Sequence, residues 1–346
     1  MSSTTDFFPT TKTSNIAKVA VPNCPACDST QRKHLYDVRE HEYSNTTDDV
    51  FPLHECLGCA AWYLDPRPAE SALGIIYPPN YYAYVLDVTK PDDIQKSREG
   101  LVNRIAKKFQ KKRLKPLEKY TTLDSNTRWL DIGCSNGNVL EWLKDVYGFS
   151  GVGLDLSERA VNFCRERGFQ AYVSRFEEFQ LPPGEEKFDV VLSSHVIEHV
   201  ASPKEYMEKA YELLKPGGLC VFITPNIDTW EARLFGKHWG GLHVPRHWTM
   251  LDEKSSRSLG ERSGFEFLEA AYSNNPTFWV WTFHSMLEPI LGRNFVDFFL
   301  PSDHRFVNNR LTTVGRLGFF TFWDIANTIF TGKSANMMCI FRKPLK

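Results

Sequence analysis

The segment that most constrains the fold runs from Trp129 to Leu140 and reads Trp-Leu-Asp-Ile-Gly-Cys-Ser-Asn-Gly-Asn-Val-Leu. An apolar stretch ends in Asp131 and turns through Gly133 and Gly137 into a predicted helix. Glycines at such a turn permit positive φ angles and let a ligand approach the backbone. The helix that follows offers free N–H groups and the positive end of its dipole. The turn therefore predicts a binding site for an anionic group of a nucleotide-like ligand.

From residue 127 onward, predicted strands alternate with predicted helices. Alternation of this kind predicts a doubly wound, mostly parallel α/β sheet that helices cover on both faces. Strands are expected at Trp129–Ile132, Gly151–Leu154, Gln170–Val173, Phe188–Ser193, Leu219–Ile223, Phe265–Ala271 and Met337–Arg342. Helices are expected at Asn138–Asp145, Glu158–Arg167, Ser202–Leu214 and Glu253–Ser263, and a turn at Lys215–Gly218.

Two nucleotide classes fit such a turn. A dinucleotide site needs Gly-x-Gly-x-x-Gly, whereas this chain has Ser135 and Asn138 where further glycines would stand. Asp155 ends the next predicted strand, 24 residues after Asp131. A carboxylate at this place can accept hydrogen bonds from both hydroxyls of an adenosine ribose. The alternative for Asp155 is a helix N-cap.

Residues 125–272 resemble the S-adenosylmethionine-dependent methyltransferases of the Rossmann-like class. The motifs that carry the resemblance are Leu-Asp-Ile-Gly-Cys-Ser-Asn-Gly137, Gly-Leu-Asp155, the fourth-strand stretch from Phe188 to Val200, and Leu-Leu-Lys-Pro-Gly-Gly-Leu219. The resemblance implies a seven-stranded sheet that an antiparallel last strand, Met337–Arg342, completes.

The resemblance also implies S-adenosylmethionine as cofactor. A helix N-terminus suits the cofactor's carboxylate, and Asp131 can complement its cationic end. Arg175 stands where the family often has an acid beside the adenine, so that contact passes to Phe176 and Glu177. The implied cofactor-binding residues are Asp131, Gly133, Cys134, Gly137, Asp155, Leu156, Phe176, Glu177, Ser194 and His195.

Four of the eight cysteines form two Cys-x-x-Cys pairs, Cys24/Cys27 and Cys56/Cys59, separated by 28 residues. Four thiolates in two such turns predict a tetrahedral, structural Zn²⁺ site. A redox pair and unmetallated thiols are the alternatives. With the Asp65–Pro68 and Tyr77–Tyr82 stretches that follow, the pairs resemble the zinc-binding N-terminal module of bacterial sugar, glycan and natural-product methyltransferases. The nucleotide-sugar C-methyltransferases carry a similar module.

Histidines supply the candidate bases for an acceptor hydroxyl, because imidazole titrates near neutral pH. The Trp239–Trp248 stretch also resembles a segment of small-molecule methyltransferases, and we expect it to cover the pocket. His247 with His243 is the favoured base, and His195 is the third candidate, with shaping of the cofactor pocket as its alternative. Arg246 is expected to hold an anionic substrate group through its planar fork. Structural hydrogen bonding is the alternative for each histidine and the preferred role of His199.

The expected organisation has four parts. Residues 1–20 are a flexible tail, 21–86 the zinc-binding module, 87–124 a basic helical linker and 125–346 the methyltransferase domain. Within that domain, residues 273–333 form an aromatic-rich insert, with thirteen Phe or Trp residues between Pro276 and Phe330. We expect a helical insert that packs on the core or on a second subunit, which makes a homodimer a candidate. A substrate tunnel and a membrane-surface contact are the alternatives.

Composition narrows the function classes. The formal net charge is −1, so a whole-protein field that attracts nucleic acid is not expected. The N-terminal stretch has no apolar core typical of a secretory signal, and no membrane span is expected, which favours a cytoplasmic enzyme. The predicted function is methyl transfer to oxygen or nitrogen of a small molecule. Alternatives are an RNA-modifying methyltransferase, a nucleotide-sugar C-methyltransferase and a non-catalytic binding module.

Overall fold

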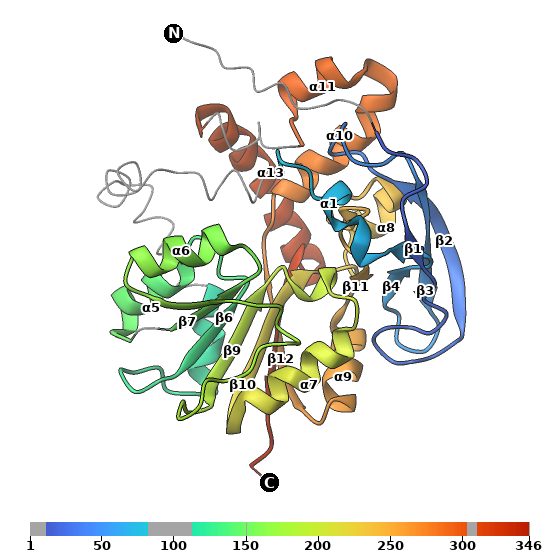
Figure 1. Cartoon of the computed structure of the whole chain (residues 1–346). Coiled ribbons are helices and arrows are strands. Elements are labelled where there is room, and N and C mark those ends of the chain that lie inside the picture. Colours follow the sequence, from blue (N-terminus) through green and yellow to red (C-terminus); the bar gives the residue numbers. More distant parts are fainter. Residues whose placement is uncertain (1–11, 82–112, 150, 303–309, 346) are drawn as a thin grey trace.

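A computed structural model describes residues 12–81, 113–149, 151–302 and 310–345 (Figure 1). Its centre is a seven-stranded sheet of order β12-β13-β10-β9-β6-β7-β8. Strand β13 pairs antiparallel with both of its neighbours, β10 and β12. This confirms the predicted seven-stranded sheet and its antiparallel last strand. The strands are β6 (Trp129–Ile132), β7 (Val152–Asp155), β8 (Gln170–Val173), β9 (Phe188–Ser194), β10 (Leu214–Pro225), β12 (Glu266–Ser273) and β13 (Asn336–Arg342).

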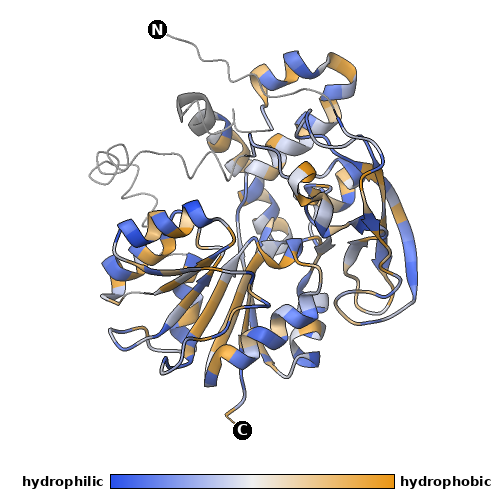
Figure 2. Cartoon of the chain, viewed as in Figure 1, coloured by the Kyte–Doolittle hydropathy of each residue, from blue (hydrophilic) through white to orange (hydrophobic). Residues whose placement is uncertain are grey.

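Helices cover both faces of this sheet, and the inner strands are apolar along their length because both faces are buried (Figure 2). Val190 and Val221 face a cluster with α5 and residues 114–117, whereas their neighbours Val191 and Phe222 face α7 and α9. The helices are α5 (Asn138–Tyr147), α6 (Glu158–Glu166), α7 (Pro203–Leu213), α8 (Trp230–Phe235) and α9 (Glu253–Arg262). The turn expected at Lys215–Gly218 is instead an irregularity inside β10, where pairing with β9 shifts register.

The N-terminal residues build a second sheet of order β11-β4-β3-β2. Its edge strand β11 (Thr249–Met250) belongs to the loop before α9 and pairs with β4, so one sheet combines N-terminal residues with a segment that lies far along the chain. The other elements of this region are β1 (Lys18–Val19), β2 (Arg32–Arg39), β3 (Val50–Cys56), β4 (Trp62–Leu64), β5 (Arg67–Pro68) and α1 (Leu73–Ile76).

The expectation that residues 1–20 form a flexible tail is wrong for the last part of this range. Ile16 is buried, and the Asp49 carboxylate accepts the backbone N–H groups of Asn15 and Ile16 at 2.7 and 3.0 Å. Strand β1 then pairs with β5. Residues 1–11 and most of the basic linker helix lie outside the described residues, and the end of that linker is a 3-10 helix, Lys115–Lys119.

The aromatic-rich insert between β12 and β13 is helical, as expected. Because β12 is parallel to β9 and β10, the insert leaves and re-enters the sheet at the end where those strands finish. It projects there, opposite the C-terminus (Figure 1). Its helices are α10 (Thr277–Leu291), α11 (Arg293–Phe299) and α13 (Arg310–Thr331).

Candidate active site

The glycine turn after β6 has the geometry that its sequence predicts. Gly133 and Gly137 have φ angles of 71° and 73°, in the left-handed region that favours glycine. A Cβ at Gly133 would approach Val196 Cγ2 to 2.8 Å, and one at Gly137 would approach Cys164 Sγ to 2.9 Å. The turn therefore needs glycine at both positions for conformation and for space.

Asp155 ends β7 beside this turn. Its Oδ2 accepts the Ser135 N–H at 2.9 Å and its Oδ1 accepts the Ser157 N–H at 2.8 Å. The N-cap of α6 is Ser157, whose hydroxyl accepts the Ala160 N–H, so the N-cap alternative for Asp155 does not hold. Each carboxylate oxygen keeps a further lone pair. The half-buried Asp155 can therefore still accept hydrogen bonds from ligand hydroxyls.

Asp131 lies buried on β6, one residue before its end. Burial raises the pKa of its carboxyl to about 8; the positive charge of Arg113 opposes this rise, and the negative charge of Asp155 adds to it. The Arg113 guanidinium also donates to the Ser194 hydroxyl at the end of β9. Sequence analysis assigned the stretch that contains Arg113 only to the basic linker of residues 87–124 and so missed Arg113 as a site residue.

The remaining expected cofactor residues divide into two groups. Leu156 is 68% exposed beyond β7 and Glu177 is half-buried, so both are accessible. The Cys134 and Phe176 side chains lie elsewhere than expected. The Cys134 thiol is buried under the turn, 3.9 Å from Cys164 Sγ, and the Phe176 ring packs in the core, with its centroid 4.6 Å from that of Tyr206.

His195 follows β9 directly, in a left-handed conformation with φ 57°. Its Nδ1 lies 3.1 Å from Oε1 of Glu198, and its side chain is 32% exposed. Burial alone would raise the pKa of Glu198, but the hydrogen bond and charge of His195, with the charges of His247 and His199, lower it. The ionised carboxylate also accepts the Thr224 hydroxyl at 3.2 Å. The His195 imidazole is thus partly exposed to solvent and hydrogen-bonded through Nδ1 to a buried carboxylate.

His199 and His247 flank the same carboxylate. His247 donates its Nδ1–H to the Gly241 carbonyl at 2.9 Å, which leaves Nε2 facing Glu198 Oε1 at 3.9 Å. His199 Nδ1 lies 2.9 Å from the Tyr77 hydroxyl and 3.1 Å from the Arg246 carbonyl. Burial lowers the pKa of both histidines. Potential ligand atoms of Glu198, His199 and His247 lie within 4.8 Å of one another, close enough to hold a metal ion.

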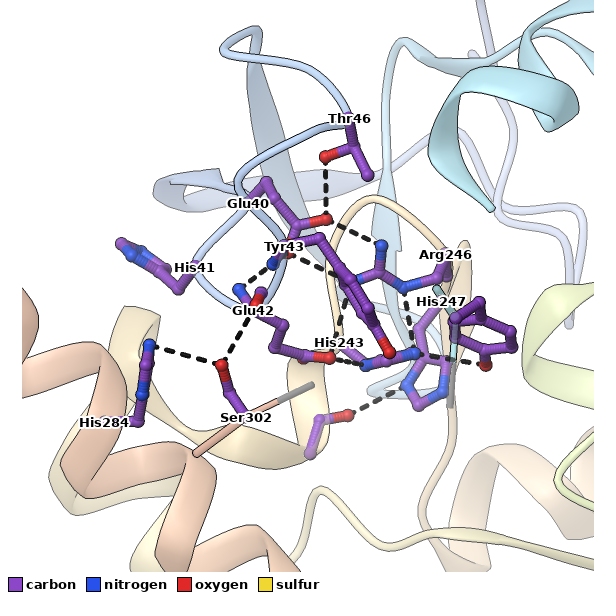
Figure 3. Close-up of polar contacts among 12 residues, drawn as sticks. Glu40, His41, Glu42, Tyr43, Thr46, His243, Arg246, His247, His284 and Ser302 are labelled. Atoms are coloured by element: carbon purple, nitrogen blue, oxygen red, sulfur yellow. Dashed lines mark hydrogen bonds and ion pairs between the residues drawn. The ribbon is translucent and has the colours of Figure 1, made fainter. Parts of the chain in front are cut away.

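Figure 3 shows the cluster that fixes the loop carrying His243 and His247. Arg246 is fully buried, and its guanidinium donates to Glu40 at 2.6 and 3.0 Å, to Glu42 at 3.4 Å and to the Ile76 carbonyl at 3.0 Å. Its Nε–H donates to Nε2 of His243 at 2.9 Å. His243 Nδ1 lies 2.5 Å from a carboxylate oxygen of Glu42.

These contacts correct two expectations from the sequence. The Arg246 fork is paired with carboxylates of the N-terminal region and not with an anionic substrate group. His243 is buried with both ring nitrogens occupied, and desolvation together with the Arg246 charge keeps its pKa well below its usual range. Of the three expected bases, His195 is the one that combines exposure with a carboxylate partner.

The four cysteines of the two pairs converge as the spacing predicts. Cys24 and Cys59 Sγ are 3.6 Å apart, Cys27 and Cys56 Sγ are 3.4 Å apart, and all four lie within 4.8 Å of one another. Zn–S bonds of about 2.3 Å in a tetrahedron require S···S separations of about 3.8 Å. The four thiols therefore fit a Zn²⁺ ion.

The sheet, the glycine turn and the Asp155 carboxylate define a Rossmann-like fold of the methyltransferase class. A family model described as "Methyltransferase domain" matches residues 99–270. The ubiquinone biosynthesis O-methyltransferase of Roseobacter denitrificans is 32% identical over 173 residues, which cover 44% of this chain and 66% of that protein. The enzyme of that name from a Ruegeria species is 31% identical, covering 45% of this chain and 67% of that protein.

The chain belongs to the S-adenosylmethionine-dependent methyltransferases. It spans about two thirds of the length of the curated relatives it matches. Among solved structures, it is similar to phosphoethanolamine N-methyltransferase 2 of Haemonchus contortus, with 16% identity, a TM-score of 0.46, and coverage of 82% of this chain and 63% of that one.

Proposed function

We propose that this methyltransferase transfers the methyl group to a hydroxyl oxygen of a small molecule such as a sugar, a glycan precursor or a natural product, with His195 as general base. The observation that carries the proposal is the His195–Glu198 pair at the end of β9, beside the glycine turn. The relatives named O-methyltransferases support oxygen as the accepting atom.

The residues around the turn fit the parts of S-adenosylmethionine, which supplies a methyl group activated by a positively charged sulfur. The Asp155 carboxylate would accept the ribose hydroxyls, and the exposed Leu156 would cover the adenine. Arg113 would hold the cofactor's carboxylate, for which a planar guanidinium is suited. Asp131, buried beside the turn, would face the amino group.

His195 would take the acceptor's proton on Nε2 while the acceptor oxygen forms a bond to the methyl carbon. S-adenosylmethionine would supply that carbon, and the electron pair of its carbon–sulfur bond would stay on the departing sulfur. Glu198 holds Nδ1–H in place and stabilises the imidazolium that forms. Such a base typically contributes about 10²–10⁴-fold to the rate. Placing the two reactants in line can contribute a further 7–11 kcal/mol or so.

The four cysteines would hold a structural Zn²⁺ ion, because their thiols supply four ligands and a closed site. The ion would join the segment before β2 to the β3–β4 hairpin. That hairpin is coupled to the active site, since Leu64 of β4 donates its N–H to the Trp248 carbonyl and Trp248 donates its N–H to the Glu198 carbonyl.

The experiment supplies zinc-loaded enzyme with S-adenosylmethionine and a panel of hydroxylated sugars, phenols and their amino analogues. Release of S-adenosylhomocysteine is expected with a hydroxylated acceptor and not with the amino analogue that replaces the same hydroxyl. Turnover confined to the amino compounds would overturn oxygen as the accepting atom. Turnover of RNA with none of the small molecules would favour the RNA-modifying alternative.

A further inference from the structure

Two buried thiols lie directly beneath the glycine turn and outside the zinc cluster. Cys134 belongs to the turn itself, and Cys164 belongs to α6, which packs against β7 and β8 (Figure 1). Their Sγ atoms are 3.9 Å apart, and both residues belong to a small buried cluster that also holds Leu140 and Val161. The proposed reaction uses neither thiol.

The turn and β7 are built closely around the two sulfur atoms. A Cβ at Gly153 of β7 would approach Cys134 Sγ to 2.7 Å, and a Cβ at Gly137 would approach Cys164 Sγ to 2.9 Å. Both glycines thus leave the room that the sulfur atoms occupy. Because protein interiors are close-packed, a displacement of either sulfur atom must also move the turn or its neighbours.

The Cys164 thiol also supports the part of the turn that contacts Asp155. It donates its S–H to the Ser135 carbonyl at 3.3 Å. The Ser135 N–H donates in turn to Oδ2 of Asp155 at 2.9 Å, in the carboxylate that we expect to bind the ribose. The thiol therefore helps to fix the Ser135 backbone, which orients this carboxylate.

The surroundings make the two sulfur atoms chemically different. The hydrogen bond with Cys134 lowers the pKa of the Cys164 thiol, burial opposes this effect, and the positive charge of Arg167 assists it. The same hydrogen bond and burial raise the pKa of Cys134. The thiolate is the nucleophile in thiol oxidation, so Cys164 is the sulfur that reacts first. Ligand-binding loops open more readily than the core, which gives a small oxidant access to the pair.

We propose that Cys134 and Cys164 form a reversible disulfide, with hydrogen peroxide as the oxidant, and that this disulfide weakens cofactor binding. The Cys164 thiolate attacks one peroxide oxygen, the O–O bond breaks, and the departing hydroxide takes up the proton that Cys164 released. Cys134 sulfur then attacks the sulfenic acid of Cys164. The S–S bond forms, the S–O bond breaks, and hydroxide leaves as water with the Cys134 proton. Two thiols and one peroxide thus give one disulfide and two waters.

The disulfide would change the turn in two ways. An S–S bond is about 2.05 Å long, so the two sulfur atoms must approach each other by roughly 1.9 Å. Cys164 also loses the S–H that it donates to the Ser135 carbonyl. Because both changes act beside Asp155, we expect the oxidised protein to bind S-adenosylhomocysteine about tenfold more weakly. This effect on affinity rests on the proposed function, which takes the turn as the cofactor site.

The test treats the zinc-loaded full chain with a small excess of hydrogen peroxide and maps its peptides by mass spectrometry. A peptide pair linked through Cys134 and Cys164 is expected, and dithiothreitol should separate it. Calorimetry of the same samples should show weaker S-adenosylhomocysteine binding after oxidation and recovery after reduction. Cys164→Ala should bind equally with and without peroxide, whereas Cys220→Ala, which removes a buried thiol of β10, should respond like the wild type.

Three outcomes would overturn the proposal: no linked peptide, a linked peptide with unchanged affinity, or an equal peroxide effect in Cys164→Ala. The last outcome would assign the effect to other thiols, such as those of the zinc cluster. Peptide mapping needs neither cofactor nor acceptor. Lack of S-adenosylhomocysteine binding by the reduced protein would overturn the effect on affinity together with the proposed cofactor site, whereas absence of the linked peptide would overturn the disulfide alone.

Discussion

Oε1 of Glu198 lies 3.1 Å from Nδ1 of His195, with the carboxylate fully buried and the imidazole partly open. The two residues are three positions apart, and both follow the carboxyl end of β9, beside Gly133. In this pair the carboxylate fixes the orientation of the ring and leaves Nε2 for an acceptor.

Replacing the base should therefore affect turnover and not cofactor binding. His195→Asn is expected to lower kcat roughly 10²–10⁴-fold, because proton removal from the acceptor is lost. Glu198→Gln should lower kcat less, since the ring remains. The matched control is His34→Asn, which removes an exposed imidazole 2.9 Å from Asp37. A His195→Asn enzyme with wild-type kcat would refute the assignment.

Protonation of Asp131 should make the stability of the ligand-free protein depend on pH. Its pKa rises from an ordinary 3.8 to about 8, chiefly by burial. The folded state therefore holds this proton more tightly than the unfolded state, and the contribution is complete below about pH 4 and is lost as pH rises toward 8.

Asp131→Asn should remove this dependence. The variant is expected to melt at a higher temperature than the wild type at pH 8, with a smaller difference at pH 5, and to bind the cofactor more weakly. Thermal melts across this range, with calorimetry of cofactor binding, measure both effects. A lower melting temperature for the variant at pH 8 would show that the ionised carboxylate stabilises the fold.

The buried Arg246–Glu40 pair should be a major stabilising element. Removing one partner of such a pair typically costs 3–5 kcal/mol or so, because the other charge stays buried without its partner. Arg246→Ala is expected to lower the free energy of unfolding by about that amount. Arg257→Ala, which breaks an exposed pair with Glu253, should change it by less than about 1 kcal/mol. Equal effects of the two variants in urea titrations would contradict this account.

The cysteine cluster should bind zinc at about one ion per chain. Cys59→Ser is expected to abolish most of this zinc and to lower both the melting temperature and kcat, since the β3–β4 hairpin supports Trp248 and Glu198. Cys220→Ala removes a buried thiol of β10 and should leave the zinc content unchanged. Metal analysis of the purified variants measures this directly. Full activity in a metal-free wild type would exclude a supporting role for the ion.

The sheet could be predicted from the sequence because the signals that define it lie within short stretches of the chain. Apolar runs define β6, β9 and β10, and glycine conformation defines the turn at Gly133 and Gly137. Which of the three candidate histidines can act as a base depends instead on contacts between residues that are far apart in the chain. His243 is buried because Glu42 and Arg246, 204 positions apart in the chain, meet beside it. Spacing within the loop cannot reveal that contact.

Two other features also depend on tertiary packing. Arg113 is one of several basic residues in the linker of residues 87–124, and its hydrogen bond to Ser194 distinguishes it from the others only in three dimensions. The sequence of α13 does not show which of its sides faces the protein, whereas the structure pairs Trp279 with Asp324, so the side that carries Asp324 and Phe320 is inside. Likewise, Asp49 holds Ile16 through backbone N–H groups, which any sequence at that position could offer.

Calorimetric titration of the wild-type protein with S-adenosylhomocysteine tests the central claim most directly. We expect saturable binding, weakened at least tenfold in Asp155→Ala through lost charge-assisted hydrogen bonds, and no binding of a nicotinamide dinucleotide. Absence of S-adenosylhomocysteine binding, or tight binding of the dinucleotide in its place, would contradict the account.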